Sequence, residues 1–165
     1  MRIEATFDTS FWVHIVYLDR VDVLLADYEL ICTDAVAREL GRNNPTSHRL
    51  QRLLTAGTIQ SVTPRVEQIS LYGEGERAAI NLALERHLPL LIDDWRPYEA
   101  ARVAGVAVVN TPAYLVQLYS QGHLTLSQVL GDLGRLARRG TLRPVWLQSA
   151  LEIVAKIRHR ESTHE

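Results

Sequence analysis

The sequence contains one cysteine, Cys32, among its 165 residues, and it lacks long apolar runs. An internal disulfide is therefore excluded, which favours a reducing, cytoplasmic location. The N-terminal segment carries Glu4 and Asp8 and has no apolar stretch of the kind found in a secretory signal. Apolar stretches such as Phe11 to Leu18 are far shorter than the ~20 residues that a membrane-spanning helix needs. We therefore expect a protein that is neither secreted nor embedded in a membrane.

A net positive charge is also lacking, since the formal charge at pH 7 is −1. The composition alone therefore does not indicate a nucleic-acid-binding protein. Basic residues are concentrated near the C-terminus, where residues 135–160 hold seven of them against one acid, Glu152. Such a run is usually a solvated helix face, so it is weak evidence for a nucleic-acid partner.

Strand-like and helix-like segments alternate over the first part of the chain. Strands are expected at residues 3–7, 29–32, 58–63, 88–92 and 106–109, with helical segments between them. The fourth strand is apolar throughout, which suits the middle of a parallel sheet covered on both faces. Alternation with short turns predicts a parallel sheet flanked by helices. Residues 124–139 and 144–158 then follow as two helical segments without a strand between them. We expect a domain of residues 1–124 and an appended helical hairpin of residues 125–160.

Acidic residues stand where the expected strands end or the expected helices begin. Asp8 follows the first strand, and Asp93 and Asp94 follow the fourth. Glu39 lies in the helix after the second strand, and Glu76 begins a helix after a Gly-x-Gly turn. The carboxyl ends of parallel strands meet at one edge of the sheet, where ligands bind. The spacing therefore predicts that several of these acids meet at one site.

A group of carboxylates at one site needs a cation. Two unit charges about 4 Å apart repel by roughly 4 kcal/mol at an effective dielectric of 20. Hard oxygen ligands favour Mg²⁺ or Mn²⁺, which lower the pKa of bound water and neutralise charge on phosphate. Each acid also has a structural interpretation: Asp8 as a helix cap, Glu39 as a surface residue, and Glu76 as a complement to the helix dipole. Taken singly, these acids do not identify a metal site.

Taken together, these segments resemble the PIN-domain family. Asp8-Thr9-Ser10 is similar to the D-x-S opening of the family, and Val36 to Leu40 is similar to its V-x-x-E-L helix. The segment from Gly73 to Ala83 is similar to the family's G-x-G-E-A-x-A-I segment. The segment from Leu91 to Val106 is similar to the family's L-I-D-D…A-R-x-x-A-x-x-x-G pattern. The last pattern is typical of a prokaryotic branch related to VapC-type toxins. The resemblance runs in the correct order from about Ile3 to Leu124. It implies a three-layer α/β/α sandwich with a parallel sheet ordered 3-2-1-4-5, here followed by the helical extension.

The resemblance implies an endoribonuclease that depends on Mg²⁺ or Mn²⁺. Carried onto this sequence, it makes Asp8, Glu39, Glu76 and Asp94 the catalytic acids. The same resemblance gives Asp8, Glu76, Asp94 and Asp93 as metal ligands, with Glu39 as a ligand or as a residue that orients water. Asp94 is preferred over Asp93, but residues 95–99 form a longer link to the next helix than the family has. The choice between the two aspartates therefore stays open.

The resemblance also indicates which residues contact RNA. Thr9, Ser10 and Thr111 match polar positions that line the site. The side chains expected to guide the RNA backbone are those of Arg38, Arg96 and Arg102. His14, in the otherwise apolar first helix, is expected to pack in the core or face a partner.

Partners and alternatives follow from the same segments. The apolar first helix is either buried on both sides or part of a dimer or antitoxin groove. Because the family that the sequence resembles commonly dimerises, we expect a homodimer, and we also expect an antitoxin protein, with the protein acting as the toxin of the pair. A non-catalytic PIN-like module that binds RNA or protein is the main alternative. A small phosphohydrolase is less favoured, because Asp8-Thr9-Ser10 lacks the nucleophilic D-x-D pattern.

Overall fold

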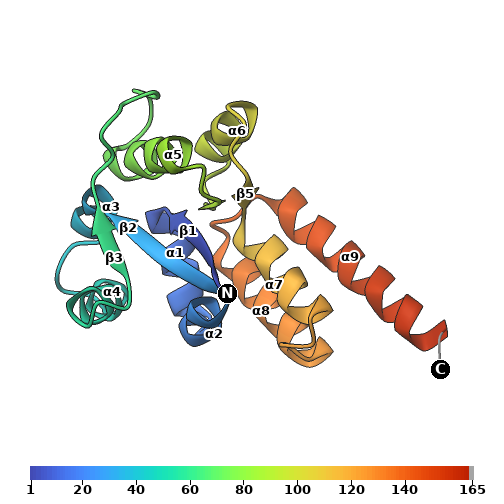
Figure 1. Cartoon of the computed structure of the whole chain (residues 1–165). Helices are drawn as coiled ribbons and strands as arrows, with labels where there is room; N and C mark the ends of the chain where they lie inside the picture. Colours follow the sequence, from blue (N-terminus) through green and yellow to red (C-terminus); the bar gives the residue numbers. More distant parts are fainter. Residues whose placement is uncertain (164–165) are drawn as a thin grey trace. The chain divides into compact units, whose positions relative to one another are not determined.

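The structure, a computed structural model, describes residues 1–163 (Figure 1). Its strands are β1 (Ile3–Phe7), β2 (Tyr28–Thr33), β3 (Gln60–Val62), β4 (Leu90–Leu91) and β5 (Val108–Val109). Its helices are α1 (Thr9–Tyr17), α2 (Val21–Asp27), α3 (Asp34–Glu39), α4 (Pro45–Thr55), α5 (Glu74–Arg86), α6 (Trp95–Val103), α7 (Thr111–Ser120), α8 (Leu126–Arg139) and α9 (Pro144–Thr163). The alternation of strands and helices confirms the predicted α/β class.

The strands form a parallel sheet that is five strands wide in the described chain, in the order β3-β2-β1-β4-β5. The central strand β1 pairs with β2 on one side and with β4 on the other. The outer strands β3 and β5 pair with β2 and β4. The predicted order 3-2-1-4-5 is confirmed. Because all strands run the same way, their carboxyl ends meet at one edge of the sheet.

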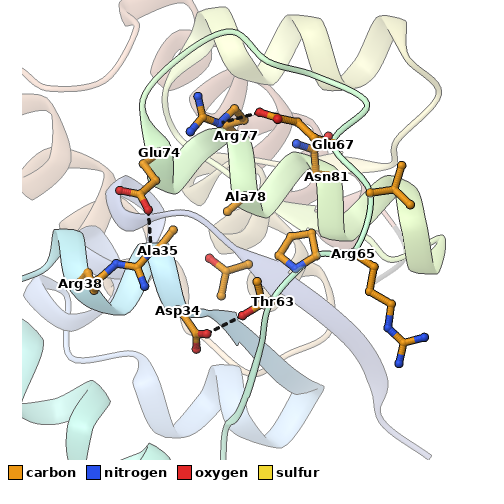
Figure 2. Close-up of a pocket in the computed structure, with 13 residues that line it drawn as sticks. Asp34, Ala35, Arg38, Thr63, Arg65, Glu67, Glu74, Arg77, Ala78 and Asn81 are labelled. Atoms are coloured by element: carbon orange, nitrogen blue, oxygen red, sulfur yellow. Dashed lines mark hydrogen bonds and ion pairs between the residues drawn. The ribbon is translucent and has the colours of Figure 1, made fainter.

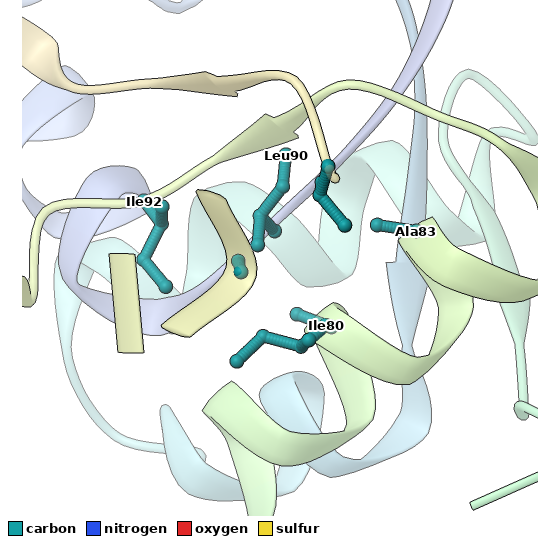
Figure 3. Close-up of a cluster of buried hydrophobic side chains, with 7 residues drawn as sticks. Ile80, Ala83, Leu90 and Ile92 are labelled. Carbon is teal, nitrogen blue, oxygen red and sulfur yellow. The ribbon is translucent and has the colours of Figure 1, made fainter. Parts of the chain in front are cut away.

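Helices α5 and α6 cover one face of the sheet. Thr6 of β1 is in register with Ile31 of β2 and Leu90 of β4, so these side chains point to the same face. Leu90 packs in a cluster with Ile80 and Ala83 of α5 (Figure 3), and the same cluster includes Ala101 of α6. This packing fixes the start of α5 and the start of α6 at the carboxyl edge of the sheet.

Helix α1 lies on the opposite face. Phe7 follows Thr6 on β1 and points the other way, and its ring stacks on Trp12 with centroids 5.2 Å apart. Phe11, Trp12 and Ile15 are fully buried. These three side chains follow the buried interpretation of α1, whereas Val13 and Val16 are half-buried and Tyr17 is exposed. The described sheet thus has helices on both faces, which makes the three-layer arrangement that was predicted.

The linking segment after Asp94 differs from the prediction. Residues 95–99 were expected to form an extended link, but helix α6 begins at Trp95 and includes them. Pro97 is compatible with this start, because it occupies the first turn, where backbone N–H groups have no intrahelical partner. Asp94 is therefore the N-cap residue of α6. The strands β4 and β5 are also shorter than the apolar runs that predicted them.

The chain divides into two compact units, Met1–Val109 and the residues from Asn110 onward. The second unit contains α7, α8 and α9, so the predicted pair of C-terminal helices is present. Helix α8 begins with a capping box between Thr125 and Gln128 and ends at Gly140 in the left-handed conformation. The predicted boundary at residues 124 and 125 lies later than this division, and the extent of the PIN domain stays a prediction. No helix within residues 1–163 is both long and apolar enough to cross a membrane.

Cys32 lies at the centre of the first unit. Its side chain is fully buried in β2, where the Sγ–H donates to the carbonyl oxygen of Thr33 at 3.2 Å. Burial, and after it the negative charge of Asp34, raises the pKa of the thiol to about 12. The thiol is therefore protonated at neutral pH and packs as a small apolar group.

Candidate functional site

Asp8 stands at the carboxyl end of β1 and has two structural partners. As the N-cap of α1, it accepts a hydrogen bond from the backbone N–H of Phe11 at 2.9 Å. The Ser10 hydroxyl donates to its other oxygen at 2.6 Å. The carboxyl group is fully buried. Burial raises its pKa to about 8, the two hydrogen bonds oppose this shift, and the charges of Asp93 and Glu76 add to it. A buried acid surrounded by like charges is typical of a functional site.

Asp93 lies beside Asp8 because β1 and β4 are neighbours, with Phe7 in register with Leu91. Its buried carboxylate is 2.6 Å from Nδ1 of His14, a distance at which an Nδ1–H donates to the carboxylate oxygen. The backbone N–H of Asp93 donates to Ser10 Oγ at 3.3 Å. Ser10 and His14 are one turn apart on α1, so a single helix face holds both the side chain and the backbone of Asp93.

Glu76, in the first turn of α5, connects the other acids. Burial is the main cause that raises its pKa, backbone hydrogen bonds from Glu76 itself and from Gly73 oppose this shift, and the charges of Glu39 and Asp94 add to it. Its Oε2 atom is buried and has no hydrogen-bond partner among the described residues. A buried carboxylate oxygen without a partner is energetically unfavourable unless a ligand or cation satisfies it. The charge of Glu76 also raises the pKa of the buried Asp8. Glu76 therefore interacts electrostatically both with Asp8 and with the exposed acids Glu39 and Asp94.

Glu39 reaches this cluster through a gap left by a glycine. The Thr9 hydroxyl donates to Glu39 Oε2 at 3.0 Å. A Cβ atom at Gly75 would lie only 1.8 Å from that oxygen, 3.0 Å from Glu39 Cδ and 3.3 Å from Thr9 Oγ1. A Cβ at Gly73 would likewise lie 2.4 Å from Glu76 Oε2. The Gly-x-Gly turn therefore leaves the space that the two glutamates occupy.

The five acids make a donor set of the right chemistry for a hard dication. Asp8, Asp93, Glu76, Glu39 and Asp94 are linked by mutual charge effects, and all supply oxygen ligands, which Mg²⁺ and Mn²⁺ prefer. In the described part of the chain, no three His, Cys, Asp or Glu side chains already converge closely enough to hold a metal ion. The exposed side chains of Glu39 and Asp94 would have to turn inward on binding. A bound cation would satisfy the Glu76 oxygen that has no hydrogen-bond partner among the described residues.

The predicted arginines are exposed at the surface of the first unit. Arg38 Nη2 is 2.5 Å from Glu74 Oε1, and Arg102 Nη2 is 3.0 Å from Glu99 Oε2. Arg96, in the first turn of α6, is exposed. Thr111 begins α7 in the second unit and is buried. The roles of these residues in binding RNA remain predictions.

His14 is the residue of this site whose role the sequence did not reveal. It was expected to pack in the core or to face a partner, and it is indeed buried, but it also contacts a site acid. The available signal was its position four residues after Ser10, on the helix that directly follows Asp8. A lone polar residue on an apolar helix is compatible with many burial environments, so that spacing alone did not identify Asp93 as its partner.

Replacing His14 with alanine is expected to reduce the free energy of unfolding by about 2 kcal/mol, because the buried Asp93 carboxylate loses a charge-assisted hydrogen bond. Urea denaturation measures this loss. The double variant His14→Ala/Asp93→Asn provides the control, since removing the carboxylate charge should restore part of the stability. Equal stability of the single and double variants would show that the loss comes from packing rather than from the contact with Asp93.

An all-parallel 3-2-1-4-5 sheet with acids at its carboxyl edge defines a nuclease-type α/β fold. Residues 4–151 match the family model described as PIN domain (DUF3368), so the chain belongs to the PIN-domain family. Many members of this family are nucleases. A search of the curated proteins finds no match.

Among solved structures, the chain is similar to a PilT N-terminus domain protein, SSO1118, from the hyperthermophilic archaeon Sulfolobus solfataricus P2. The two share 14% sequence identity, with a TM-score of 0.43, over 66% of this chain and 87% of the other.

Proposed function

We propose that the protein is an endoribonuclease that depends on Mg²⁺ or Mn²⁺ and hydrolyses phosphodiester bonds of RNA. The observation that carries the proposal is the buried, unpartnered oxygen of Glu76 at the centre of a group of acids. Burial and the neighbouring negative charges make the charged forms of Asp8 and Glu76 unfavourable. A dication would relieve both effects at once, and the family to which the chain belongs supports this use of the site.

The chain's own residues divide into ligands and supports. Asp8, Glu76 and Asp94, supplemented by Asp93, would hold the metal ion. When bound, such an ion supplies a water molecule of lowered pKa and neutralises negative charge on the phosphate. Ser10 orients Asp8, and His14 orients Asp93. Glu39, held by Thr9, is placed to accept a proton from water or to serve as a further ligand.

The substrate would be guided by exposed polar groups around the acids. We propose that Arg38, Arg96 and Arg102 bind the phosphates of the RNA backbone, since guanidinium groups bind phosphate irrespective of the RNA sequence. Thr9 and Ser10 of the first unit would complete the lining. The proposal takes the protein as a cytoplasmic toxin of a toxin–antitoxin pair that acts as a homodimer. The resemblance to the VapC-type branch supports the toxin, antitoxin and homodimer assignments, and the single cysteine supports the cytoplasmic location.

Titration of the wild-type protein with Mn²⁺ and Mg²⁺ tests the proposal. Cleavage of a labelled RNA should appear with the metal and disappear with EDTA. The melting temperature should rise in parallel, because a ligand at 100 times its Kd adds about 2.7 kcal/mol to the folded state, worth roughly 5 to 10 °C here. Glu29→Gln is the matched control, since Glu29 is an exposed acid at the opposite end of β2 and should leave both responses unchanged.

The same titration distinguishes a metal-dependent nuclease from the main alternative, a non-catalytic binding module. A PIN-like module without catalytic activity would bind RNA yet show neither metal-dependent cleavage nor a metal-dependent rise in melting temperature. A rise in melting temperature without cleavage would retain the metal site and remove the nuclease assignment.

A further inference from the structure

A polar pocket adjoins the acid site at the carboxyl ends of β2 and β3 (Figure 2). It has a volume of about 300 Å³ and lies between α3, α5 and the segment of residues 63–67. This volume is at the lower end of the range of about 300 to 1,000 Å³ found for small-molecule sites. The pocket and the acid site share two elements: Arg38 precedes Glu39 on α3, and Glu74 precedes Glu76 by two residues on α5.

The outer wall of the pocket is held in place by side chains of α5. The Asn81 carboxamide oxygen accepts hydrogen bonds from the backbone N–H groups of Gln68 and Ile69 at 2.9 and 2.8 Å, and its amide donates to the Ile69 carbonyl at 2.9 Å. The Glu85 carboxylate accepts from the backbone N–H of Arg65 at 2.7 Å. These bonds fix the backbone of a surface segment that would otherwise be poorly ordered. The pocket is therefore formed before any ligand arrives.

The lining of the pocket includes a fixed negative charge, the carboxylate of Asp34. The hydroxyl groups of Ser61 and Thr63 donate to the two carboxylate oxygens of Asp34. These hydrogen bonds, Ser61 first, lower the pKa of Asp34 below its ordinary value. Asp34 is therefore ionised at neutral pH, and each oxygen retains a lone pair that can accept a further hydrogen bond.

The remaining lining combines small apolar groups with arginines. Ala35 of α3 and Ala78 of α5 contribute methyl groups to the lining. Arg77 pairs with Glu67 at 3.2 Å, and Arg38 pairs with Glu74. The side chain of Arg65 extends outward at the edge of the pocket (Figure 2). Its guanidinium group has no ion-pair or hydrogen-bond partner among the described residues.

We propose that this pocket binds one unpaired nucleotide of an RNA strand, next to the phosphodiester bond that lies over the acid site. The base would lie against the methyl groups of Ala35 and Ala78, with its amino or imino hydrogens facing Asp34, and its phosphate would meet Arg65. The proposal rests on the proposed nuclease function for the position of the cleaved bond, but the binding itself does not require catalysis. A base within a duplex is stacked on both faces and paired along one edge, so it cannot enter the pocket, and the pocket selects single-stranded RNA.

Binding of a fluorescent single-stranded RNA of twelve nucleotides tests the proposal. The Asp8→Asn protein provides the background, because it should not cut the probe. Ala78→Leu places a larger side chain in the lining of the pocket and should weaken binding by about tenfold, the scale expected for one lost base contact. Arg65→Ala removes only a side chain, since Glu85 holds the backbone N–H of residue 65, and should weaken binding by about fivefold. Arg86→Ala is the matched control: it removes the same charge from the far end of α5 and should change affinity less than twofold.

The outcomes distinguish this proposal from the nuclease assignment. Unchanged affinity in Ala78→Leu and Arg65→Ala, with normal metal-dependent cleavage by the wild-type protein, would overturn the pocket and leave the nuclease intact. An equal loss of affinity in Arg65→Ala and Arg86→Ala would also overturn it, because the binding would then be general electrostatic attraction. Loss of affinity in the two pocket variants alone supports the pocket even if the wild-type protein cuts no RNA. Should Ala78→Leu fail to fold, the exposed Arg65→Ala decides the result.

Discussion

Replacing Asp8 with asparagine is expected to abolish metal-dependent RNA cleavage and, at the same time, to stabilise the metal-free protein at high pH. Asparagine is almost the same size as aspartate and caps a helix equally well, so the bond to the Phe11 N–H is retained. The substitution removes one negative charge from the acid site. Cleavage should fall at least 10³-fold, because the charge that holds the dication is lost.

The effect on stability follows from the pKa of Asp8. In the folded protein this pKa is about 8, against an ordinary value of 3.8. Between about pH 4 and pH 8, the folded state therefore keeps a proton that the unfolded chain has released. Stability falls as the pH rises wherever the folded state binds more protons, so the wild-type protein loses unfolding free energy across this range, on the order of 5 kcal/mol.

Urea denaturation in EDTA at pH 5 and pH 9 measures the free energy of unfolding of the wild-type and Asp8→Asn proteins. The wild-type protein should lose stability between the two values, and the Asp8→Asn protein should lose much less. Added Mn²⁺ should reverse the loss only in the wild-type protein. If both proteins showed the same dependence on pH, the buried carboxyl group would not be the source, and Asp8 would have to be assigned a different environment.

Replacing Gly75 with alanine is expected to reduce cleavage by about 10²-fold while leaving the fold as stable as before. The added Cβ atom would occupy the position of Glu39 Oε2, which lies 1.8 Å away. The Glu39 side chain is exposed and flexible, so it can rotate away with little strain. Displacement of a functional group by about 1 Å lowers rates by about this factor. Alanine also favours the helix by about 0.5 to 1 kcal/mol, which offsets the lost Thr9 hydrogen bond.

Gly131→Ala is the matched control for this variant. Gly131 lies in helix α8, and a Cβ atom there would meet nothing within 4 Å. It should gain the same helix propensity without loss of cleavage. The double variant Gly75→Ala/Glu39→Ala should cut RNA no more slowly than Glu39→Ala alone. An additional loss in the double variant would show that the alanine acts on the backbone of α5 rather than on Glu39.

The sheet order and the positions of the acids were predictable from sequence because both follow from local patterns. Apolar runs mark the buried strands, and parallel strands bring their carboxyl ends to one edge. Asp8 and Asp93 follow β1 and β4, and Glu76 lies in the first turn of α5, as these local patterns indicated. The start of α6 was misplaced because Trp95 to Val103 contains Pro97, which reads as an interruption in sequence yet is tolerated in a first turn.

The contacts between side chains were not predictable in the same way. The pairing of His14 with Asp93 joins residues 79 positions apart, and it depends on the rotation of α1 against the sheet. The polar pocket between α3 and α5 depends on a surface segment whose position is set by hydrogen bonds to the Asn81 amide. No local pattern in residues 63–69 indicates that Asn81 would hold this segment. The unpartnered oxygen of Glu76 is likewise a product of packing, since a first-turn glutamate usually faces water.

The burial of Cys32 gives every variant a common internal reporter. A protonated thiol sealed inside the central sheet does not react with alkylating reagents until β2 separates from its neighbours. Under conditions where opening is rapid and reversible, the labelling rate is proportional to the fraction of molecules that are transiently open. Mass spectrometry of the alkylated chain would then rank the opening free energies of metal-free and metal-loaded samples without denaturant, at a pH where the exposed thiol is partly ionised.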